Sequence, residues 1–173
     1  KLRAQAMTDP LTGVFNRRYL QSQAAVEMSR ARRQHHPIAL IAIDIDHFKH
    51  INDEFGHDVG DDVLKSFTHI VMDLLRQEDL LCRVGGEEFA VLLPNTSIAQ
   101  AHQVAERICL SIEQASTPIE HEGVQHSLKV TASLGVTALN PEEKSLKHAL
   151  KRADIGLYQA KLNGRNRVVV NAV

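Results

Sequence analysis

The feature that most constrains the fold is an unbroken apolar run, Ile-Ala-Leu-Ile-Ala-Ile over residues 38–43, that ends in Asp44-Ile45-Asp46. A run without polar alternation is typical of a strand buried on both faces, as in a sheet covered by helices. Carboxylates that follow such a strand lie where α/β folds usually bind ligands. Polar residues and glycines are dense over 48–62, which favours a pocket. The alternative is that Asp46 caps the following helix and Asp44 is merely solvated.

A second acidic motif, Gly-Gly-Glu-Glu-Phe, occupies residues 85–89 between the apolar stretches 79–84 and 89–93. This pattern predicts a β-hairpin whose tight turn carries two adjacent carboxylates. Two like charges held side by side repel each other unless a cation lies between them. The tip is therefore a candidate metal or phosphate site, although the hairpin taken by itself favours an ordinary acidic turn.

Apolar periodicity over the rest of the chain predicts one α/β domain, residues 1–173, with a central mixed sheet of about five strands flanked by helices. The order strand, helices, hairpin, helix, strand is that of the βαββαβ split unit. We expect helices over about 16–34, 48–54, 59–74 and 145–162, and one that begins after Thr96. Strands are expected over about 38–45, 130–136 and 167–170, with the hairpin over about 79–94.

The split unit brings the end of the first strand beside the tip of the hairpin. Asp44 with Glu87 or Glu88 would then form a site made only of oxygen ligands. Such ligands suit Mg²⁺, which commonly binds one or two protein acids together with substrate phosphates. Phosphoryl or nucleotidyl transfer follows as the reaction class, because its catalysis consists mainly of positioning and charge neutralisation.

Composition excludes several classes of protein. The chain has 173 residues and a net charge of -1, which disfavours a nucleic-acid binder. No apolar run approaches membrane-spanning length and no signal-peptide pattern is present. Its 2 cysteines are too few for a disulfide framework or a CxxC metal site, so we expect a cytoplasmic setting. Because residue 1 is Lys rather than Met, we expect a piece of a longer protein.

Four motifs in this order resemble those of the GGDEF family, the diguanylate cyclases, over nearly the whole chain. The pentapeptide at 85–89 is the GGEEF form of the family signature. Asp-Pro-Leu-Thr-Gly at 9–13, with Asn-Arg-Arg at 16–18, resembles the N-terminal motif. Residues 44–61 resemble the metal and nucleotide segment, and 153–167 resemble the C-terminal signature. The resemblance implies the palm-like fold of GGDEF and nucleotidyl cyclase domains. It also implies that the chain is the C-terminal catalytic piece of a longer sensor protein, which a membrane sensor could tether.

The resemblance also implies an activity: condensation of two GTP molecules into cyclic di-GMP with release of two pyrophosphates. Each domain would bind one GTP, and a homodimer would bring the two halves face to face. Carried over by position, Asp44, the carbonyl of Ile45 and Glu87 would ligate Mg²⁺, with Mn²⁺ as an alternative. Glu88 would be a second-metal ligand or the general base for the 3′-hydroxyl.

The nucleotide contacts follow from the same resemblance. Guanine would be read by Asn52 and Asp61. The phosphates would be bound by Lys49, Lys161 and Arg165 and by backbone N–H groups around His47 and Phe48, and Gly85 and Gly86 would leave room for the nucleotide.

Simpler interpretations exist for these residues. Asp61 could complement a helix dipole, as we expect of Asp62, and Lys161 could do so at a helix C-terminus. Asn52 could be a local cap. His47 and His50 show no paired spacing of metal ligands, so we expect surface groups.

A second site is suggested by Arg76 and Asp79, whose Arg-x-x-Asp pattern stands five residues before the pentapeptide, where the family's inhibitory product site lies. Arg107 matches a further arginine of that site. The arginine fork suits phosphate or a guanine edge, and the aspartate accepts from guanine. An ordinary surface ion pair is the alternative.

Two rival functions share these residues. A catalytically silent GGDEF domain would bind GTP or cyclic di-GMP without turnover, but such domains usually lose signature acids, and Asp44, Glu87 and Glu88 are all present. Another nucleotide cyclase or a polymerase palm would share the metal chemistry. It is disfavoured because the GGEEF hairpin, the guanine-reading pair and the Arg-x-x-Asp pattern occur together.

Overall fold

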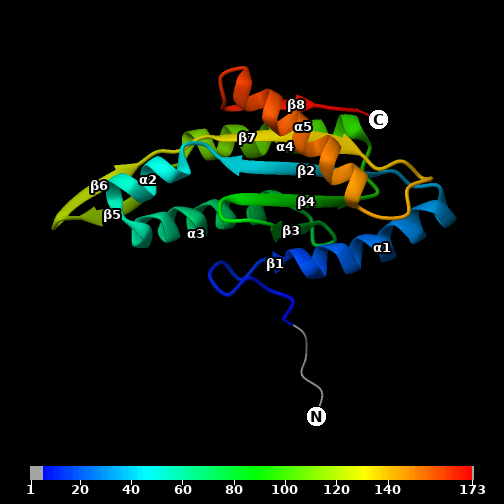
Figure 1. Ribbon diagram of the computed structural model, residues 1–173, viewed down its shortest axis with the longest axis horizontal. Coiled ribbons are helices and arrows are strands. Elements are labelled where there is room, and N and C mark those ends of the chain that lie inside the picture. Colours follow the sequence, from blue (N-terminus) through cyan, green and yellow to red (C-terminus); the bar gives the residue numbers. More distant parts are fainter. Residues whose placement is uncertain (1–5, 173) are drawn as a thin grey trace, which may run out of the picture.

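A computed structural model describes residues 6–172 and shows a mixed six-stranded sheet with the strand order β1-β3-β4-β2-β7-β8 (Figure 1). A separate two-stranded ribbon, β5-β6, stands at one end of the molecule. The strands are β1 (Phe15–Asn16), β2 (Ile38–Ile45), β3 (Leu80–Arg83), β4 (Glu88–Pro94), β5 (Thr117–His121), β6 (Val124–Leu128), β7 (Ala132–Ala138) and β8 (Arg167–Val170). The helices are α1 (Arg17–Gln34), α2 (Phe48–Phe55), α3 (His57–Leu74), α4 (Ile98–Gln114) and α5 (Lys147–Leu162).

Strand β2 is the centre of the sheet, and all eight of its residues are buried. It pairs antiparallel with β4 on one side and with β7 on the other. The edges are added by parallel pairs, β1 with β3 and β7 with β8. The α/β fold class with a mixed sheet is confirmed. The sheet gains its sixth strand from β1, which is only two residues long and therefore carries no periodic signal.

Helices cover both faces of this sheet. Alternate residues of β2 point to opposite faces: Leu40 and Ala42 belong to a cluster with buried residues of α1 and α5, whereas Ile41 and Ile43 pack in a cluster with those of α3 and α4. The continuous apolar run in the sequence is explained by this double coverage. The acids lie at the end of β2, where the strand leaves the covered part of the sheet and continues into a turn.

Local capping determines where two helices begin. The side chain of Asn16 accepts a hydrogen bond from Tyr19 N at 3.0 Å, so α1 starts at Arg17. Ser97 and Gln100 form a reciprocal capping box at the start of α4. The expected helix after Thr96 is thus confirmed, with Ser97 as its cap.

The β5-β6 ribbon was not expected from the sequence. Val124–Leu128 has four exposed residues and one half-buried residue, so it lacks the apolar alternation that marks a half-buried strand. The ribbon packs beside α2, where the ring of Phe55 lies 5.2 Å from that of His121. Within residues 6–172, no helix is long and apolar enough to cross a membrane.

Candidate active site

The end of β2 and the start of β4 lie side by side, so the two acidic motifs meet. Asp44 pairs in register with Glu88, and the backbone N–H of Ile45 donates to the carbonyl of Glu87 at 3.3 Å. Residues opposite each other in an antiparallel pair send their side chains to the same face. Asp44 and Glu88 therefore share one face of the sheet, whereas Glu87 lies in the turn just before β4.

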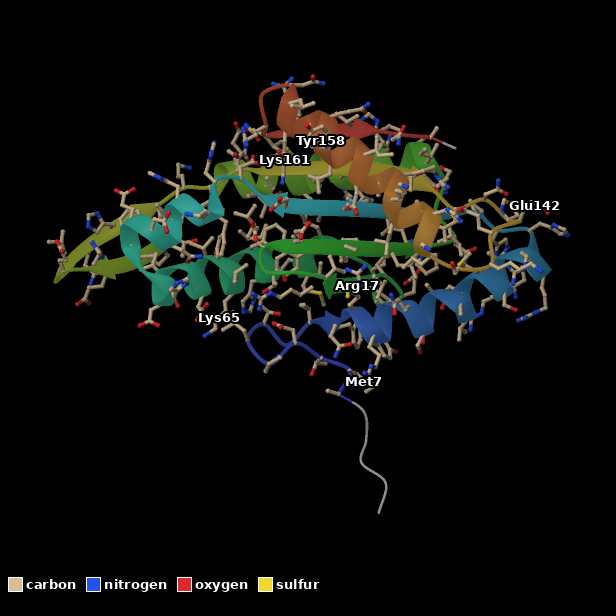
Figure 2. All side chains as sticks on the ribbon, in the orientation of Figure 1. Met7, Arg17, Lys65, Glu142, Tyr158 and Lys161 are labelled. Atoms are coloured by element: carbon tan, nitrogen blue, oxygen red, sulfur yellow. The ribbon has the colours of Figure 1, made fainter. Side chains whose placement is uncertain are left out.

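Asp44 is buried and its charge is poorly compensated. Only 4% of its surface is exposed, and burial raises its pKa to about 6; the negative charges of Glu87 and Glu88 act in the same direction. The ammonium of Lys161, in the last turn of α5 (Figure 2), bonds Asp44 Oδ2 and opposes the rise in pKa. The other oxygen, Oδ1, is buried and has no hydrogen-bond partner within residues 6–172.

This donor set fits a hard divalent cation. An unpartnered buried carboxylate oxygen is costly unless something positive binds it. Hard cations prefer carboxylate and carbonyl oxygens, which Asp44, Glu88 and the carbonyl of Ile45 supply at one strand end. No group of three or more His, Cys, Asp or Glu side chains in the described part of the chain forms a complete metal cage. Such a site suits an ion that takes its remaining ligands from substrate phosphates and water.

Turn geometry does not explain the two glycines before the acids, and only Gly85 is needed for a close approach. Neither Gly85 nor Gly86 has a positive φ, although the tight turn predicted from the sequence would favour one. A Cβ on Gly85 would come within 2.8 Å of Glu88 Oε1, whereas one on Gly86 would meet nothing within 4 Å. The Glu88 carboxylate thus folds back over Gly85, and Gly86 borders open space.

That open space is a pocket of about 360 Å³ on the α2 and α3 side of the hairpin. It brings together most of the residues that the resemblance assigns to the nucleotide. The lining comprises Phe48, Lys49, Asn52, His57, Asp61, Leu64, Arg83, Gly86 and Glu87. Of these, His57, Leu64 and Arg83 were not expected from the sequence.

Asn52 occupies the floor of this pocket. A Cβ on Gly60 would come within 1.9 Å of Asn52 Oδ1, so only glycine at this position of α3 admits the amide. Asn52 Oδ1 is buried without a hydrogen-bond partner in the described structure. The amide therefore does not act as a local cap and remains available to a ligand.

Comparison with known proteins identifies the family of this chain. Residues 6–167 match the family described as "Diguanylate cyclase, GGDEF domain". The chain belongs to the GGDEF family. The response regulator PleD of Caulobacter vibrioides is 46% identical over 167 residues, which make up 96% of this chain and 36% of PleD. The diguanylate cyclase DgcP of Pseudomonas aeruginosa is 44% identical over 168 residues, 97% of this chain and 24% of DgcP. This GGDEF domain thus spans well under half the length of either relative.

Solved structures show the same fold. The GGDEF domain of DgcB from Caulobacter crescentus, in complex with c-di-GMP, superposes with a TM-score of 0.89 at 30% identity, covering 99% of this chain and 96% of that chain. The active GGEEF domain of a diguanylate cyclase from Vibrio cholerae has a TM-score of 0.81 at 35% identity, covering 90% and 96%.

The residues of this GGDEF domain that are predicted to contact phosphate differ in their backbone conformation, their exposure and the partners that they already bond. His47 has a left-handed backbone (φ 57) and precedes α2, whose first N–H groups have no intrahelical partner. Lys49 is highly exposed and bonds Asp53 at 2.9 Å, one turn along α2. Lys161 lies at Asp44, and the Arg165 side chain has no hydrogen-bond or ion-pair partner within residues 6–172.

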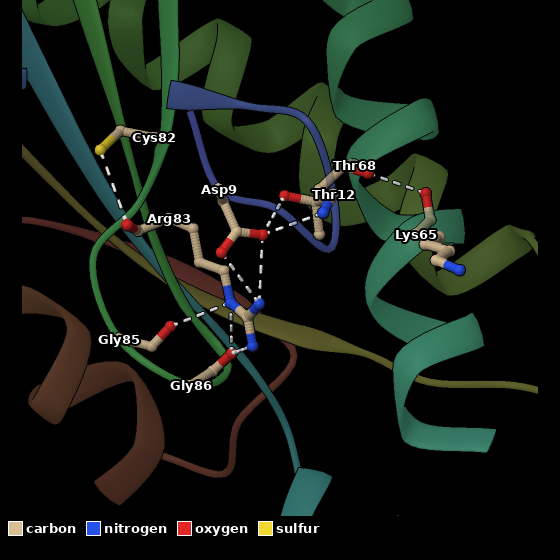
Figure 3. Close-up of polar contacts among 8 residues, drawn as sticks. All are labelled: Asp9, Thr12, Lys65, Thr68, Cys82, Arg83, Gly85 and Gly86. Carbon is tan, nitrogen blue, oxygen red and sulfur yellow. Dashed lines mark hydrogen bonds and ion pairs between the residues drawn. The ribbon is translucent and has the colours of Figure 1, made fainter. Parts of the chain in front are cut away.

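Arg83 ties the GGEEF hairpin to the N-terminal motif (Figure 3). Its Nε and Nη2 donate to the carbonyl of Gly86 at 2.9 and 2.7 Å, and Nε also reaches that of Gly85 at 3.2 Å. Nη1 lies 3.2 Å from Asp9 Oδ2, and the same oxygen accepts from Thr12 N and Oγ1. Both motifs are visible in the sequence, but their contact is not. It forms only in the folded sheet, where Asp9 and Arg83 come together.

Asp46 corrects one alternative considered from the sequence. It does not cap α2, whose N-terminus has no side-chain cap bond. Instead it is buried and accepts hydrogen bonds from the hydroxyls of Thr131 and Ser133 and from Asn166 N. Asp44, likewise, is buried rather than solvated.

The Arg-x-x-Asp pattern lies at the opposite end of the sheet. Arg76 Nη2 bonds Asp79 Oδ1 at 3.1 Å, Pro94 O at 2.9 Å and Thr96 Oγ1 at 2.7 Å. The Asp79 side chain is 3% exposed and the Arg76 side chain 49%. Arg107 is exposed on α4, and in the described structure no hydrogen bond or ion pair joins it to Arg76 or Asp79.

Proposed function

We propose that this GGDEF domain is a diguanylate cyclase catalytic domain that binds one GTP and, facing a second copy, forms cyclic di-GMP. The observation that carries the proposal is a pocket that Asn52 and Asp61 line together with Glu87, whose carbonyl accepts from the N–H of Ile45, the residue after Asp44. A guanine reader in this pocket and an acidic strand end next to it fit a guanine nucleotide whose phosphates extend toward a cation.

The strand register suggests how the acids divide their roles. Asp44, Glu88 and the carbonyl of Ile45 would hold Mg²⁺, or Mn²⁺ in its place, because Asp44 and Glu88 share one face. The bound ion would neutralise charge on the triphosphate. Glu87 lines the nucleotide pocket, so it is better placed than Glu88 to accept the proton of a 3′-hydroxyl. The order of roles implied by the resemblance is thereby exchanged.

Guanine recognition would use the amide and the carboxylate of α2 and α3. Asp61 accepts from the N1 and N2 donors of guanine, which adenine lacks at that edge, and Asn52 adds a second polar contact. Both lie in the same pocket. A buried polar site of this kind rejects a ligand that leaves its groups unpaired.

The triphosphate would be bound by cations and helix N–H groups around the strand end. Lys161 must leave Asp44 when a metal ion binds there, which frees its ammonium for phosphate. Arg165 has an unpartnered guanidinium, a fork that suits phosphate oxygens. Lys49 and the N–H groups of His47 and Phe48 would complete the cradle at the start of α2.

Chromatography of products decides the activity. A dimerised form incubated with GTP and Mg²⁺ should release cyclic di-GMP and pyrophosphate, and ATP should give no cyclic product. GTP left intact by a dimer that binds it would support a silent binding domain instead. Monomer alone is not informative, because each copy holds one GTP.

Glu-to-Gln variants test the exchanged roles. Glu88→Gln should abolish turnover and weaken Mg²⁺ activation about tenfold or more, because a ligand charge is lost. Glu87→Gln should lower turnover by roughly 10²–10⁴ while the Mg²⁺ requirement stays the same. The reverse pattern would restore the order of roles implied by the resemblance.

We also propose that Arg76, Asp79 and Arg107 bind the product and inhibit the enzyme. Arg76 supports this because it is half exposed and carries an arginine fork oriented by a buried aspartate. The bonds between Arg76 and Asp79 fix the orientation of both side chains. The exposed Arg107 would contact the ligand from α4.

A further inference from the structure

Asp46 is a buried carboxylate at the end of β2 that the proposed chemistry does not use. Thr131 Oγ1 and Ser133 Oγ each donate to it at 2.7 Å, and Asn166 N donates at 3.0 Å. Charged hydrogen bonds of this kind hold a buried acid in place. The third donor belongs to the connection between α5 and β8, so Asp46 attaches that connection to the end of β2.

The connection has an unusual backbone. Gly164, Arg165 and Asn166 have φ angles of 121, 63 and 48 degrees. Residues with a Cβ seldom occupy this left-handed region, and successive ones persist only where the surroundings hold them. Arg165 N donates to the carbonyl of Ala160 at 2.9 Å, and Asn166 N donates to Asp46. These two bonds hold the backbone on which the unpartnered Arg165 side chain stands.

Two carboxylates, Asp44 in β2 and Asp46 just after it, thus hold the end of α5 and the segment that follows it, but by different kinds of bond. Asp44 takes the ammonium of Lys161, which a cation on Asp44 would displace. Asp46 takes a backbone N–H and two hydroxyls, none of which competes with a cation or a nucleotide. Of these two carboxylate contacts, the bond of Asp46 to Asn166 is therefore the one that persists when the site is loaded.

We propose that Asp46 is a positioning residue for GTP: through Asn166 N it keeps residues 164–166 in the conformation that presents Arg165 to the triphosphate. The inference rests on the proposed function, from which the nucleotide and the cation at Asp44 are taken. Asp46 acts through Arg165 and contacts no substrate atom itself.

The test is a double-mutant cycle in nucleotide affinity. Asp46→Asn and Arg165→Ala are made singly and together, and binding of 3′-deoxy-GTP with Mg²⁺ is measured by calorimetry, since this analogue lacks the attacking hydroxyl. Arg165→Ala should weaken binding about tenfold or more, because charge-assisted bonds to phosphate are lost. Asp46→Asn should weaken it about three- to tenfold in the wild-type background and less than about twofold beside Arg165→Ala.

The matched control is Thr131→Val, which removes one hydroxyl from Asp46 but leaves the bond to Asn166. It should lower the melting temperature and change the affinity by less than about twofold. Amide exchange supplies a readout without ligand: Asn166 N–H should exchange about tenfold faster in Asp46→Asn.

Two results would overturn the inference: equal loss of affinity from Asp46→Asn in both backgrounds, or unchanged affinity although the Asn166 amide is released. Wild-type protein that binds no 3′-deoxy-GTP would instead refute the proposed function and this inference with it. Amide exchange would still report whether Asp46 holds the connection.

Discussion

Asp44 shows how a single residue can oppose folding and still be kept for chemistry. Burial is the largest cause of its raised pKa, which reaches about 6 against an ordinary 3.8, and the pairing with Lys161 only partly offsets it. The folded chain therefore holds this proton more tightly than the unfolded chain does. The stability linked to Asp44 is fully present below the unfolded-state pKa of 3.8. It is lost as the pH rises through the folded-state pKa of about 6.

Asp44→Asn should consequently stabilise the metal-free protein, and more so at higher pH. We expect the gain in free energy of unfolding to be about 1 kcal/mol larger at pH 7.5 than at pH 5. Urea denaturation of both proteins at the two pH values, with a chelator present, measures this difference. A gain that does not change with pH would mean that the carboxyl does not titrate in this window.

At the scale of elements, the GGEEF hairpin depends on a support outside itself. The Arg83 guanidinium donates hydrogen bonds to two carbonyls of the turn and forms an ion pair with Asp9. Both side chains of the ion pair are mostly buried. Arg83→Ala leaves these acceptors without their donor, so it should cost about 1–3 kcal/mol of stability. It should also speed amide exchange at the turn and lower turnover, because the acids lose their fixed geometry.

Thr12→Val is the matched control for this element. It removes the Thr12 hydroxyl from Asp9 but keeps the Thr12 N–H and the Arg83 pair. We expect lost stability with normal exchange at the turn. If the turn exchanged equally fast in both variants, the support would come from the N-terminal motif as a whole rather than from Arg83.

The bonds of the Arg-x-x-Asp element give it a structural role, and two variants separate this role from the regulatory role that we propose. Arg76→Ala should relieve product inhibition and cost about 1–3 kcal/mol, because the buried Asp79 loses its partner. Arg107→Ala should relieve inhibition with little change in stability, since Arg107 is exposed. Cyclic di-GMP titrations of initial rates, paired with thermal melts, check both. Inhibition that is unchanged in Arg107→Ala would remove this residue from the site.

Most elements were predictable because their patterns are set by burial. Val63, Phe67 and Val71 form one buried stripe of α3, and β2 is buried on both sides. The β5-β6 ribbon was missed: β6 is exposed and carries no such pattern, and β5 has only five residues, of which two are buried. β1 was missed because two residues are too few for any periodicity.

At the scale of the whole molecule, the proposed function makes one copy half of an enzyme. Each pocket would hold one GTP, so turnover would require two copies that face each other. Specific activity should rise with protein concentration over about a hundredfold range, whereas affinity for 3′-deoxy-GTP should not change. Initial rates across a dilution series measure this. Specific activity that stays constant from dilute to concentrated protein would mean a permanent dimer or a single-copy reaction.

The sequence by itself determined the fold class and the family, and it predicted most of the residues proposed for the site. These are local in origin, since periodicity and motif spacing are written along the chain. The relations among the residues were decided by tertiary structure: the register that pairs Asp44 with Glu88, the support that Arg83 gives to the turn, and the bond of Asp46 to Asn166. Each joins segments far apart in sequence, and burial on folding decides which of their polar groups must find a partner. The acidic tip of the hairpin is a turn in the sequence and one side of a pocket in the fold.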